Sequence, residues 1–321
     1  MKKLLVTGAS GLLGLNLALK AADLGWDVTG WSGRRALARV PFSAEQVDLA
    51  NPEDIPARIS MFAPDLVIHC AALADIDQAE QHPALAERLN AQAPEALAFA
   101  ARKTGAQLIH ISTDAVFDGT RGDYRETDQP NPINVYARTK LEGERAVLAA
   151  YPQALAARVN FYGWSPTGKR SLAEFFYTHL RAEQTVKGFT DVFFSPLYVG
   201  HLAQLLLKMA EGRLEGLYHV FCPQAISKYA FGVSLARLFS LDETLINPTA
   251  LQETPGGAPR SMNLSMNTDK LQAALNEPLP GELEGLQAFY TDWQAVCPTV
   301  WSRRLPENLH TVCCTKETQW N

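Results

Sequence analysis

The chain has 321 residues, of which 47% are hydrophobic and 20% are charged, and its formal net charge is −5. It is long enough for one large domain or two unequal domains, and no apolar run approaches the roughly 20 residues of a membrane-spanning helix. The charge argues against a non-specific nucleic-acid coat, but it leaves room for a local basic pocket that binds a phosphorylated ligand.

The N-terminus and the cysteines favour a cytoplasmic protein. Glycine and polar residues interrupt "MKKLLVTGAS" too early for a secretory signal. The five cysteines show no C-x-x-C spacing, and an odd number that includes the adjacent pair Cys313 and Cys314 favours reduced thiols over disulfides or a zinc site. We therefore expect no metal site, no membrane contact and no nucleic-acid partner.

Short apolar runs alternate with longer amphipathic segments in the first half, which is typical of βαβ units around a parallel sheet. The expected strands are 2–8, 27–31, 65–72, 107–112 and 155–163, and the expected helices are 12–24, 84–103 and 134–150. Residues 191–212 then predict a turn and a helix, and 216–221 predict a strand. The last twenty residues lack periodicity and are typical of a loosely held tail.

Three glycines follow the first expected strand and open the first expected helix. Gly8, Gly11 and Gly14 in "VTGASGLLG" would let the backbone turn tightly and let a pyrophosphate approach the free N–H groups of the helix. The spacing is G-x-x-G-x-x-G rather than G-x-G-x-x-G, so a purely structural turn is the alternative interpretation. The cofactor residues expected here are Gly8, Ser10, Gly11, Leu12, Leu13 and Gly14.

The end of the second expected strand indicates which dinucleotide would bind. No Asp or Glu lies between Val28 and Ala44 to accept the 2′-OH of NAD, whereas Arg34 and Arg35 could pair with a 2′-phosphate. This favours NADP(H) over NAD(H), although the two arginines could also lie in a solvated loop. Asp48, after the third strand, could accept a hydrogen bond from adenine. The expected cofactor set also includes Leu49, Ala71, Ala72 and Asn90.

Tyr136 and Lys140 are four residues apart in "NVYARTKLEGE", and on a helix they would lie on one face. An ammonium beside a phenol would lower the tyrosine pKa from about 10 and allow proton exchange with a carbonyl. Chance pairs at this spacing are common. Here, however, the pair follows the glycine turn and the strand end "IHISTDAVFDG", which is the motif order of short-chain dehydrogenases.

Eight stretches resemble the dTDP-4-dehydrorhamnose reductases and their sugar-nucleotide-binding relatives, a branch of the extended short-chain dehydrogenases. They run in the expected order from residue 4 to 271: "TGASGLLG", "HCAALADIDQAEQHP", "LNAQAPEALA", "ISTDAVFDG", "YARTKLEGE", "FFSPLYVGHLA", "GLYHV" and "PRSMNLSMNTDKL". The resemblance implies hydride transfer from NADPH to the C4 ketone of a nucleotide-linked deoxyhexose.

The resemblance also implies site residues. It makes Thr113 the catalytic hydroxyl, Tyr136 the acid and Lys140 its helper, and it also places Tyr136 and Lys140 in the cofactor set, with the lysine on the ribose hydroxyls. Asn90 would lie near the lysine in a proton relay or simply pack in a helix. Asp114, Phe161, Arg260 and Asn263 are the expected substrate contacts. A guanidinium suits a pyrophosphate, although a surface arginine is the alternative interpretation of Arg260.

We therefore expect an α/β fold, a Rossmann-type doubly wound parallel sheet with a smaller C-terminal substrate-binding subdomain. Residues 1–163 would form the NADP-binding domain, and 189–221 would return to it. Residues 164–188 and 222–300 would form the subdomain, and 301–321 the tail.

Three positions depart from the family pattern. Ala115 replaces an aromatic residue, Phe161 falls near a tryptophan, and Ser261 replaces a proline. Because a lost aromatic contact costs up to about 1 kcal/mol, these changes favour a related 4-keto sugar or another nucleotide. Two other functions stay open, a non-catalytic NADP-binding regulatory subunit of the methionine adenosyltransferase type and a nucleotide-sugar epimerase. A homodimer is a further expectation.

Overall fold

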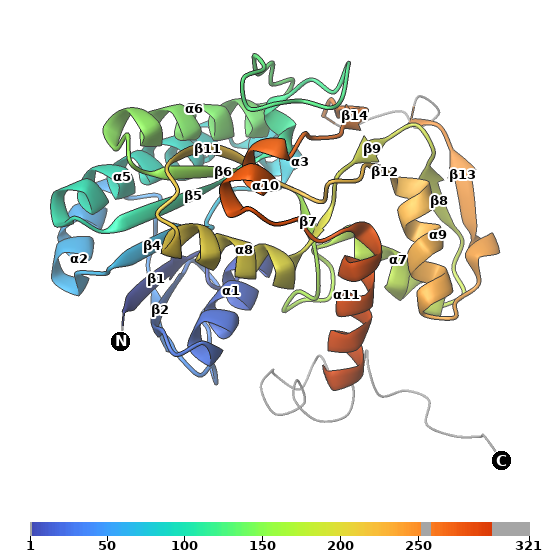
Figure 1. The fold of residues 1–321 in the computed structure, drawn as a ribbon, viewed down its shortest axis with the longest axis horizontal. Coiled ribbons are helices and arrows are strands. Elements are labelled where there is room, and N and C mark those ends of the chain that lie inside the picture. The colour runs from blue at the N-terminus through green and yellow to red at the C-terminus, as the bar shows by residue number, and fades with distance from the viewer. Residues whose placement is uncertain (1, 252–257, 297–321) are drawn as a thin grey trace.

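The computed structural model describes residues 2–251 and 258–296, so the expected tail and Cys297 lie outside the described residues (Figure 1). A parallel sheet of seven strands forms the centre, in the order β11-β6-β5-β4-β1-β2-β3. Its strands are β1 (Lys3–Thr7), β2 (Asp27–Ser32), β3 (Ser43–Gln46), β4 (Leu66–His69), β5 (Gln107–Thr113), β6 (Leu155–Val159) and β11 (Gly216–Val220). The strand order runs outward in both directions from β1 and β4, so the predicted Rossmann-type fold is confirmed.

Helices cover both faces of this sheet (Figure 1). Side chains alternate along each strand, and in β1 the residues Leu4 and Val6 face one apolar cluster while Leu5 faces the other. The first cluster includes α1 and α8, and the second includes α2 and α5. The helices of this part of the chain are α1 (Leu12–Asp23), α2 (Ile55–Phe62), α3 (Ile76–Gln81), α4 (Pro83–Glu87), α5 (Ala93–Thr104), α6 (Val135–Ala150) and α8 (Val199–Glu211).

The predicted helix over 84–103 is interrupted. A turn of π-helix at Arg88–Gln92 separates α4 from α5. Pro94 has no N–H, so it cannot donate to the carbonyl of Asn90 as a regular helix requires. Gly143 of α6 packs directly on that carbonyl, where an added Cβ would come within 1.9 Å of the oxygen. The interruption therefore lets α6, which carries Tyr136 and Lys140, pack closely on this segment.

The predicted strand over 155–163 is also two elements. The chain leaves the central sheet at Asn160, whose carbonyl accepts a hydrogen bond from Leu197 N at 2.9 Å. Beyond it, β7 (Phe161–Tyr162) pairs with β10 (Leu197–Tyr198). The chain then returns through α8 to β11, which pairs with β6 along five residues.

The rest of the described chain forms short strands and helices beside the carboxyl ends of the central strands (Figure 1). One small sheet has the order β12-β9-β14, and another pairs β13 with β8. The elements are α7 (Leu172–Arg181), β8 (Val186–Phe189), β9 (Phe193–Phe194), β12 (Ile226–Ser227), α9 (Lys228–Leu238), β13 (Ile246–Thr249), β14 (Asn263–Leu264), α10 (Asp269–Leu275) and α11 (Glu282–Val296). In the described ranges, no helix has both the length and the apolar character needed to cross a membrane.

Candidate active site

The glycine turn after β1 leaves no room for side chains. Gly8 has a positive φ of 67°, and an added Cβ would lie 2.7 Å from the backbone nitrogen of Ala71. A Cβ on Gly14 would lie 2.2 Å from the carbonyl oxygen of Gly8. Gly11 is the N-cap of α1 and offers no side chain to bond the first N–H groups of that helix. These donors and the positive end of the helix dipole suit a bound pyrophosphate.

A cavity of about 680 Å³ opens over this turn. It lies at the carboxyl ends of the parallel strands, next to the boundary between β1 and β4 where ligands bind in such sheets. Its volume is in the range of small-molecule and cofactor sites. Of the predicted residues, the cavity is lined by Gly8, Ser10, Gly11, Leu12, Leu13, Gly14, Arg34, Asp48, Leu49, Ala71, Ala72, Thr113, Asp114, Tyr136 and Phe161.

Two predicted cofactor residues, Arg35 and Asn90, make contacts away from the cavity, and a third, Lys140, does not line the cavity either. The Arg35 guanidinium donates to the carbonyl of Pro166 at 3.4 Å. Asn90 is fully buried and bonds the backbone of Leu73, accepting from its N–H at 2.8 Å and donating to its carbonyl at 3.2 Å. It also donates to the Thr139 hydroxyl at 3.1 Å. These contacts match the helix-packing interpretation of Asn90 better than direct contact with a cofactor.

The predicted catalytic residues come from β5 and α6. Thr113 ends β5, and its hydroxyl donates to Asp114 Oδ1 at 3.0 Å. Tyr136 lies on the first turn of α6 and lines the same cavity. One helical turn later, the buried Lys140 donates from Nζ to the carbonyl of Ile111 at 2.6 Å. Lys140 therefore lies behind the cavity wall, attached to the strand that carries Thr113.

The prediction that Lys140 lowers the pKa of Tyr136 is wrong. Burial raises the pKa of Tyr136 to about 12, against an opposing hydrogen bond with Thr113. Burial also lowers the pKa of Lys140 to about 8, because the ammonium is held away from water and only partly compensated by nearby Glu144. The phenol consequently holds its proton at neutral pH, which is the state that a proton donor needs.

Asp114 is buried beside Thr113 and is tied to a residue that the sequence analysis missed. Asn160 donates to Asp114 Oδ2 at 2.6 Å, and burial raises the pKa of Asp114 to about 6. Asn160 also lines the cavity. It follows the last residue of β6, so its position at the carboxyl end of a parallel strand was the available signal.

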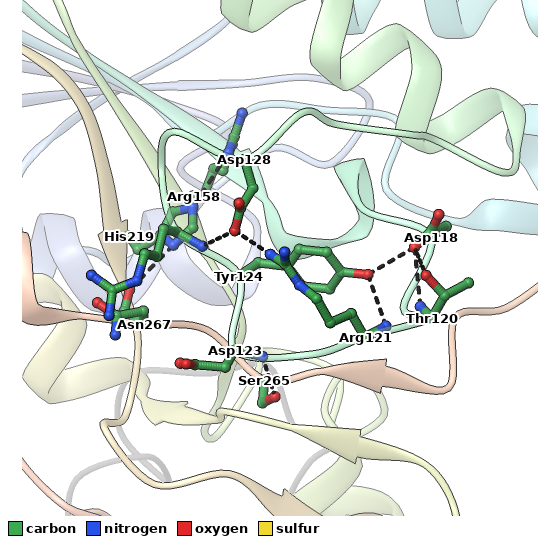
Figure 2. A network of polar contacts seen from close by, with 11 residues as sticks. Asp118, Thr120, Arg121, Asp123, Tyr124, Asp128, Arg158, His219, Ser265 and Asn267 are labelled. Carbon is green, nitrogen blue, oxygen red and sulfur yellow. Dashed lines mark hydrogen bonds and ion pairs between the residues drawn. The ribbon is translucent and has the colours of Figure 1, made fainter.

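Ser112, the neighbour of Thr113, belongs to a buried ionic network. Its hydroxyl donates to Glu144 Oε2 at 2.9 Å, and Arg158 bonds both oxygens of that carboxylate, at 2.9 and 2.6 Å. The Arg158 guanidinium also lies 3.3 Å from His219 Nε2 (Figure 2). It stacks over the Phe117 ring, 4.9 Å from the ring centroid. The network joins β5, α6, β6 and β11 next to the predicted catalytic residues.

The loop after β5 is fastened to the segment around β14 (Figure 2). Asp123 N donates to Ser265 Oγ at 2.8 Å, and Asn267 N donates to the carbonyl of Tyr124 at 2.8 Å. Asp118 accepts hydrogen bonds from Thr120 and Tyr124, and these hold the pKa of its carboxyl far below the ordinary value.

The predicted substrate residues Arg260 and Asn263 do not line the cavity. Asn263 lies against Gly122, where an added Cβ would come within 2.3 Å of its side-chain nitrogen, and its Oδ1 accepts from Ser265. Arg260 is about half exposed, with its guanidinium 3.8 Å from Asp77 Oδ2. The segment that carries Arg260 nevertheless lies next to the site, because Asn134 donates to the carbonyl of Pro259 at 3.1 Å and Ser261 donates to the carbonyl of Phe117 at 3.0 Å. The Arg260 charge also helps to lower the pKa of Lys228.

Two buried histidines stack below the carboxyl edge of the sheet. The rings of His69 and His110 are 5.3 Å apart and nearly parallel. The His69 Nδ1 atom bonds the Thr7 hydroxyl at 2.6 Å, whereas the other three ring nitrogens have no hydrogen-bond partner among the described residues. Burial, with help from the Lys140 charge, lowers the pKa of His69 to about 3 and that of His110 well below its ordinary value. Both rings are therefore neutral at pH 7.

Comparison with known proteins agrees with this geometry. Residues 1–295 match the family described as the RmlD substrate binding domain. The chain is 34% identical to a dTDP-4-dehydrorhamnose reductase of Mycobacterium tuberculosis, over 87% of this chain and 89% of that protein. It is 34% identical to the methionine adenosyltransferase 2 subunit beta of Xenopus tropicalis, over 84% of this chain and 82% of that protein.

Among solved structures, the chain resembles the dTDP-4-dehydrorhamnose reductase of Bacillus anthracis crystallised with NADP. The TM-score is 0.81 at 26% identity, and the match covers 91% of this chain and 100% of that one. The family resemblance predicted from the eight sequence stretches is thus confirmed, and the protein belongs to the RmlD substrate binding domain family.

Proposed function

We propose that this protein reduces the C4 ketone of a nucleotide-linked deoxyhexose with NADPH. The observation that carries the proposal is that Thr113 and Tyr136 line the same cavity as the glycine turn. One cavity can therefore bring a dinucleotide and a proton donor together. The related dTDP-4-dehydrorhamnose reductases, one of them crystallised with NADP, support both the cofactor and the substrate class.

The residues around the turn suit the cofactor. The free N–H groups at the start of α1 would hold the pyrophosphate, and Arg34 would pair with the 2′-phosphate. Asp48 lines the cavity and would accept a hydrogen bond from adenine. NADPH, when bound, supplies the hydride for the reduction.

The chain's own groups would complete the addition of a hydride and a proton across the carbonyl. Tyr136 donates its phenolic proton to the carbonyl oxygen, which becomes the new hydroxyl, and such general-acid catalysis typically accelerates a reaction by about 10²–10⁴. Thr113 Oγ1 orients the same oxygen by a hydrogen bond. Lys140 holds the end of β5 through its hydrogen bond to the Ile111 carbonyl. Asp114 would contact the sugar beside Thr113, next to Phe161 of the cavity wall.

The domain division, the cellular location and the oligomeric state are also part of the proposal. Pairing of β11 with β6 supports the assignment of residues 189–221 to the NADP-binding domain, with 164–188 and 222–300 as the substrate-binding subdomain. A cytoplasmic location and a homodimer are proposed from the sequence and from the family, and light scattering of the full chain would test the dimer.

The direct test is anaerobic mixing of the protein and NADPH with a panel of nucleotide-linked 4-keto-deoxyhexoses, followed by nicotinamide absorbance. Oxidation with one or more sugars, and none with the corresponding 4-hydroxy sugars, is the expected result. If NADPH binds but no member of the panel oxidises it, the reductase proposal is wrong.

A second candidate is a regulatory subunit, because the matched methionine adenosyltransferase subunit beta is as similar in sequence as the matched reductase. A regulator of this type would bind NADP(H) and a methionine adenosyltransferase without consuming the cofactor. Co-sedimentation with a purified methionine adenosyltransferase, in the same sample that fails to oxidise NADPH, would favour it over the reductase.

A further inference from the structure

Lys228 is positioned by the small sheet β12-β9-β14. It begins α9 directly after β12, and its backbone N–H donates to the carbonyl of Val192 at 3.0 Å. On the other side of β9, Phe193 N donates to the carbonyl of Met262 at 2.7 Å, which holds the segment that follows Arg260. The same short strand therefore fixes the positions of Lys228 and Arg260.

The charge of Lys228 is poorly compensated. The side chain is half-buried, and among the described residues no hydrogen bond or salt bridge engages its ammonium. Burial and the neighbouring Arg260 charge lower its pKa, and only Asp114 acts in the opposite direction. Arg158 is the contrast, because its buried guanidinium bonds both oxygens of Glu144. A half-buried cation without such a partner is costly unless a ligand supplies one.

Asp114 is not that partner. Its two oxygens already accept hydrogen bonds from Thr113 and Asn160, and its own pKa is raised to about 6 by burial. Arg260 adds a second cation, whose only ionic contact among the described residues is the exposed Asp77, at 3.8 Å. The surroundings of Lys228 therefore carry an excess of positive charge that an anionic ligand would neutralise.

Solvent exposure increases in the order Asp114, Lys228, Arg260. Asp114 is 4% exposed, Lys228 is half-buried, and the Arg260 side chain is 53% exposed. A nucleotide sugar whose ketone reaches Thr113 and Tyr136 would place its sugar beside Asp114. Its diphosphate would follow at Lys228 and Arg260, and its nucleoside would lie outermost. A diphosphate fits this order because its negative charge would neutralise the two cations.

We propose that Lys228 binds the diphosphate of the substrate jointly with Arg260, and so determines the affinity for the nucleotide part. This inference rests on the proposed function, because the reductase supplies the substrate class. The ammonium donates to non-bridging phosphate oxygens, and the sugar contacts Asp114, Thr113 and Asn160, which line the cavity. Lys228 thus acts in binding and takes no part in proton transfer.

The test is calorimetric titration of the full chain, saturated with NADPH, with the probes dTDP, UDP, thymidine and uridine. Lys228→Met keeps the length of the side chain and removes the charge, and Lys228→Arg restores a cation. For at least one diphosphate, Lys228→Met should weaken binding roughly tenfold to a hundredfold, whereas Lys228→Arg should recover most of it. Binding of NADPH should not change. Lys187→Met, at an exposed lysine of β8, is the matched control.

The outcomes separate this inference from the proposed function. If the unaltered protein binds a diphosphate and Lys228→Met binds it equally well, the role of Lys228 is wrong and the reductase proposal stands. If the unaltered protein binds NADPH but neither diphosphate, the proposed substrate class fails, and the inference fails with it. Equal weakening of nucleoside and diphosphate binding would also overturn it, since a nucleoside carries no phosphate. Thermal melting of each variant confirms that the variants are folded.

Discussion

The two ends of the candidate site are built differently. At the cofactor end, backbone groups of β1 and α1 form the turn, and glycines allow the close approach of Gly8 to Ala71. At the proposed substrate end, Lys228, Arg260 and Asn263 lie in or beside two-residue strands and connecting loops. The cofactor end depends on regular elements and backbone donors. The substrate end depends on charged side chains held by a few hydrogen bonds.

This difference suggests which end can change without loss of the fold. A side chain that lies on a short strand can be replaced while the central sheet keeps its hydrogen bonds. Between the two ends lie Thr113 and Tyr136, at the end of β5 and the start of α6, supported by the ionic network of Glu144 and Arg158. In the proposed function, the chemistry would thus have a rigid support, and substrate selectivity would depend on the less regular side of the site.

Removal of the Tyr136 hydroxyl should have the largest effect on activity. Tyr136→Phe should lower kcat by about 10² or more, because general-acid catalysis contributes that much, while the affinity for NADPH is kept. Single-turnover oxidation of NADPH measures the first quantity, and titration of the protein with NADPH measures the second. Tyr151→Phe, on the far end of α6, is the control. Near-normal turnover in Tyr136→Phe would exclude Tyr136 as the acid.

Loss of the buried ion pair between Glu144 and Arg158 should destabilise the fold. Arg158→Met leaves the buried carboxylate of Glu144 without its bidentate partner and should lower the free energy of unfolding by about 3–5 kcal/mol. The double variant Glu144→Leu with Arg158→Met should recover much of this loss, because no uncompensated charge remains. Urea denaturation measures both. A double variant as unstable as the single one would show that packing, rather than charge, causes the loss.

Acid should destabilise the protein through its neutral histidines. Burial lowers the pKa of His69 and His219 to about 3 and that of His110 well below 6.5. Below pH 6.5 the unfolded chain binds protons on these rings and the folded chain does not, so stability is full above pH 6.5 and falls toward pH 3. The raised pKa values of Asp114 and Glu174 oppose part of this. Near pH 5 we expect a net loss of about 1.4–2.8 kcal/mol per pH unit.

Urea denaturation at pH 7, 6 and 5 measures this slope. His110→Leu removes one titrating ring and its two unbonded nitrogens, and should reduce the slope by about 1.4 kcal/mol per pH unit. His82→Gln, at an exposed histidine, should leave it unchanged. An unchanged slope in His110→Leu would mean that His110 already binds a proton in the folded protein.

The regular half of the molecule could be predicted from the sequence. The alternation of apolar runs gave the strands from 2–8 to 107–112, because buried parallel strands are nearly continuous in apolar residues. The glycine turn and the strand end at Thr113 placed the cavity for the same reason, since carboxyl ends of parallel strands meet at one edge. The interruptions of the predicted helix near Pro94 and of the predicted strand at Asn160 were not predicted. Each depends on a tertiary contact, with Gly143 and Leu197 respectively.

The substrate end could not be predicted in the same way. Lys228 follows a two-residue strand, and its proximity to Arg260 comes from pairing across β9 rather than from any periodic pattern. The Tyr136 pKa was mispredicted because spacing on a helix places Lys140 on the same face but cannot show that its ammonium bonds Ile111. Helical spacing gives neighbours, whereas hydrogen-bond partners require the packed structure.

The smallest effect is expected from the two arginines at the cofactor end, Arg34 and Arg35, on the affinity for the cofactor. Arg34 lines the cavity, but Arg35 donates to the carbonyl of Pro166, so the two arginines are not equivalent. Arg34→Ala should weaken NADPH binding roughly tenfold and leave NADH binding nearly unchanged, because only NADPH carries the 2′-phosphate. Arg35→Ala should change both little, and fluorescence titration of each variant with each cofactor measures the difference. Equal losses for the two cofactors in Arg34→Ala would instead mean that Arg34 binds the shared pyrophosphate. Arg170, which also lines the cavity, would then be the next residue to test for the 2′-phosphate.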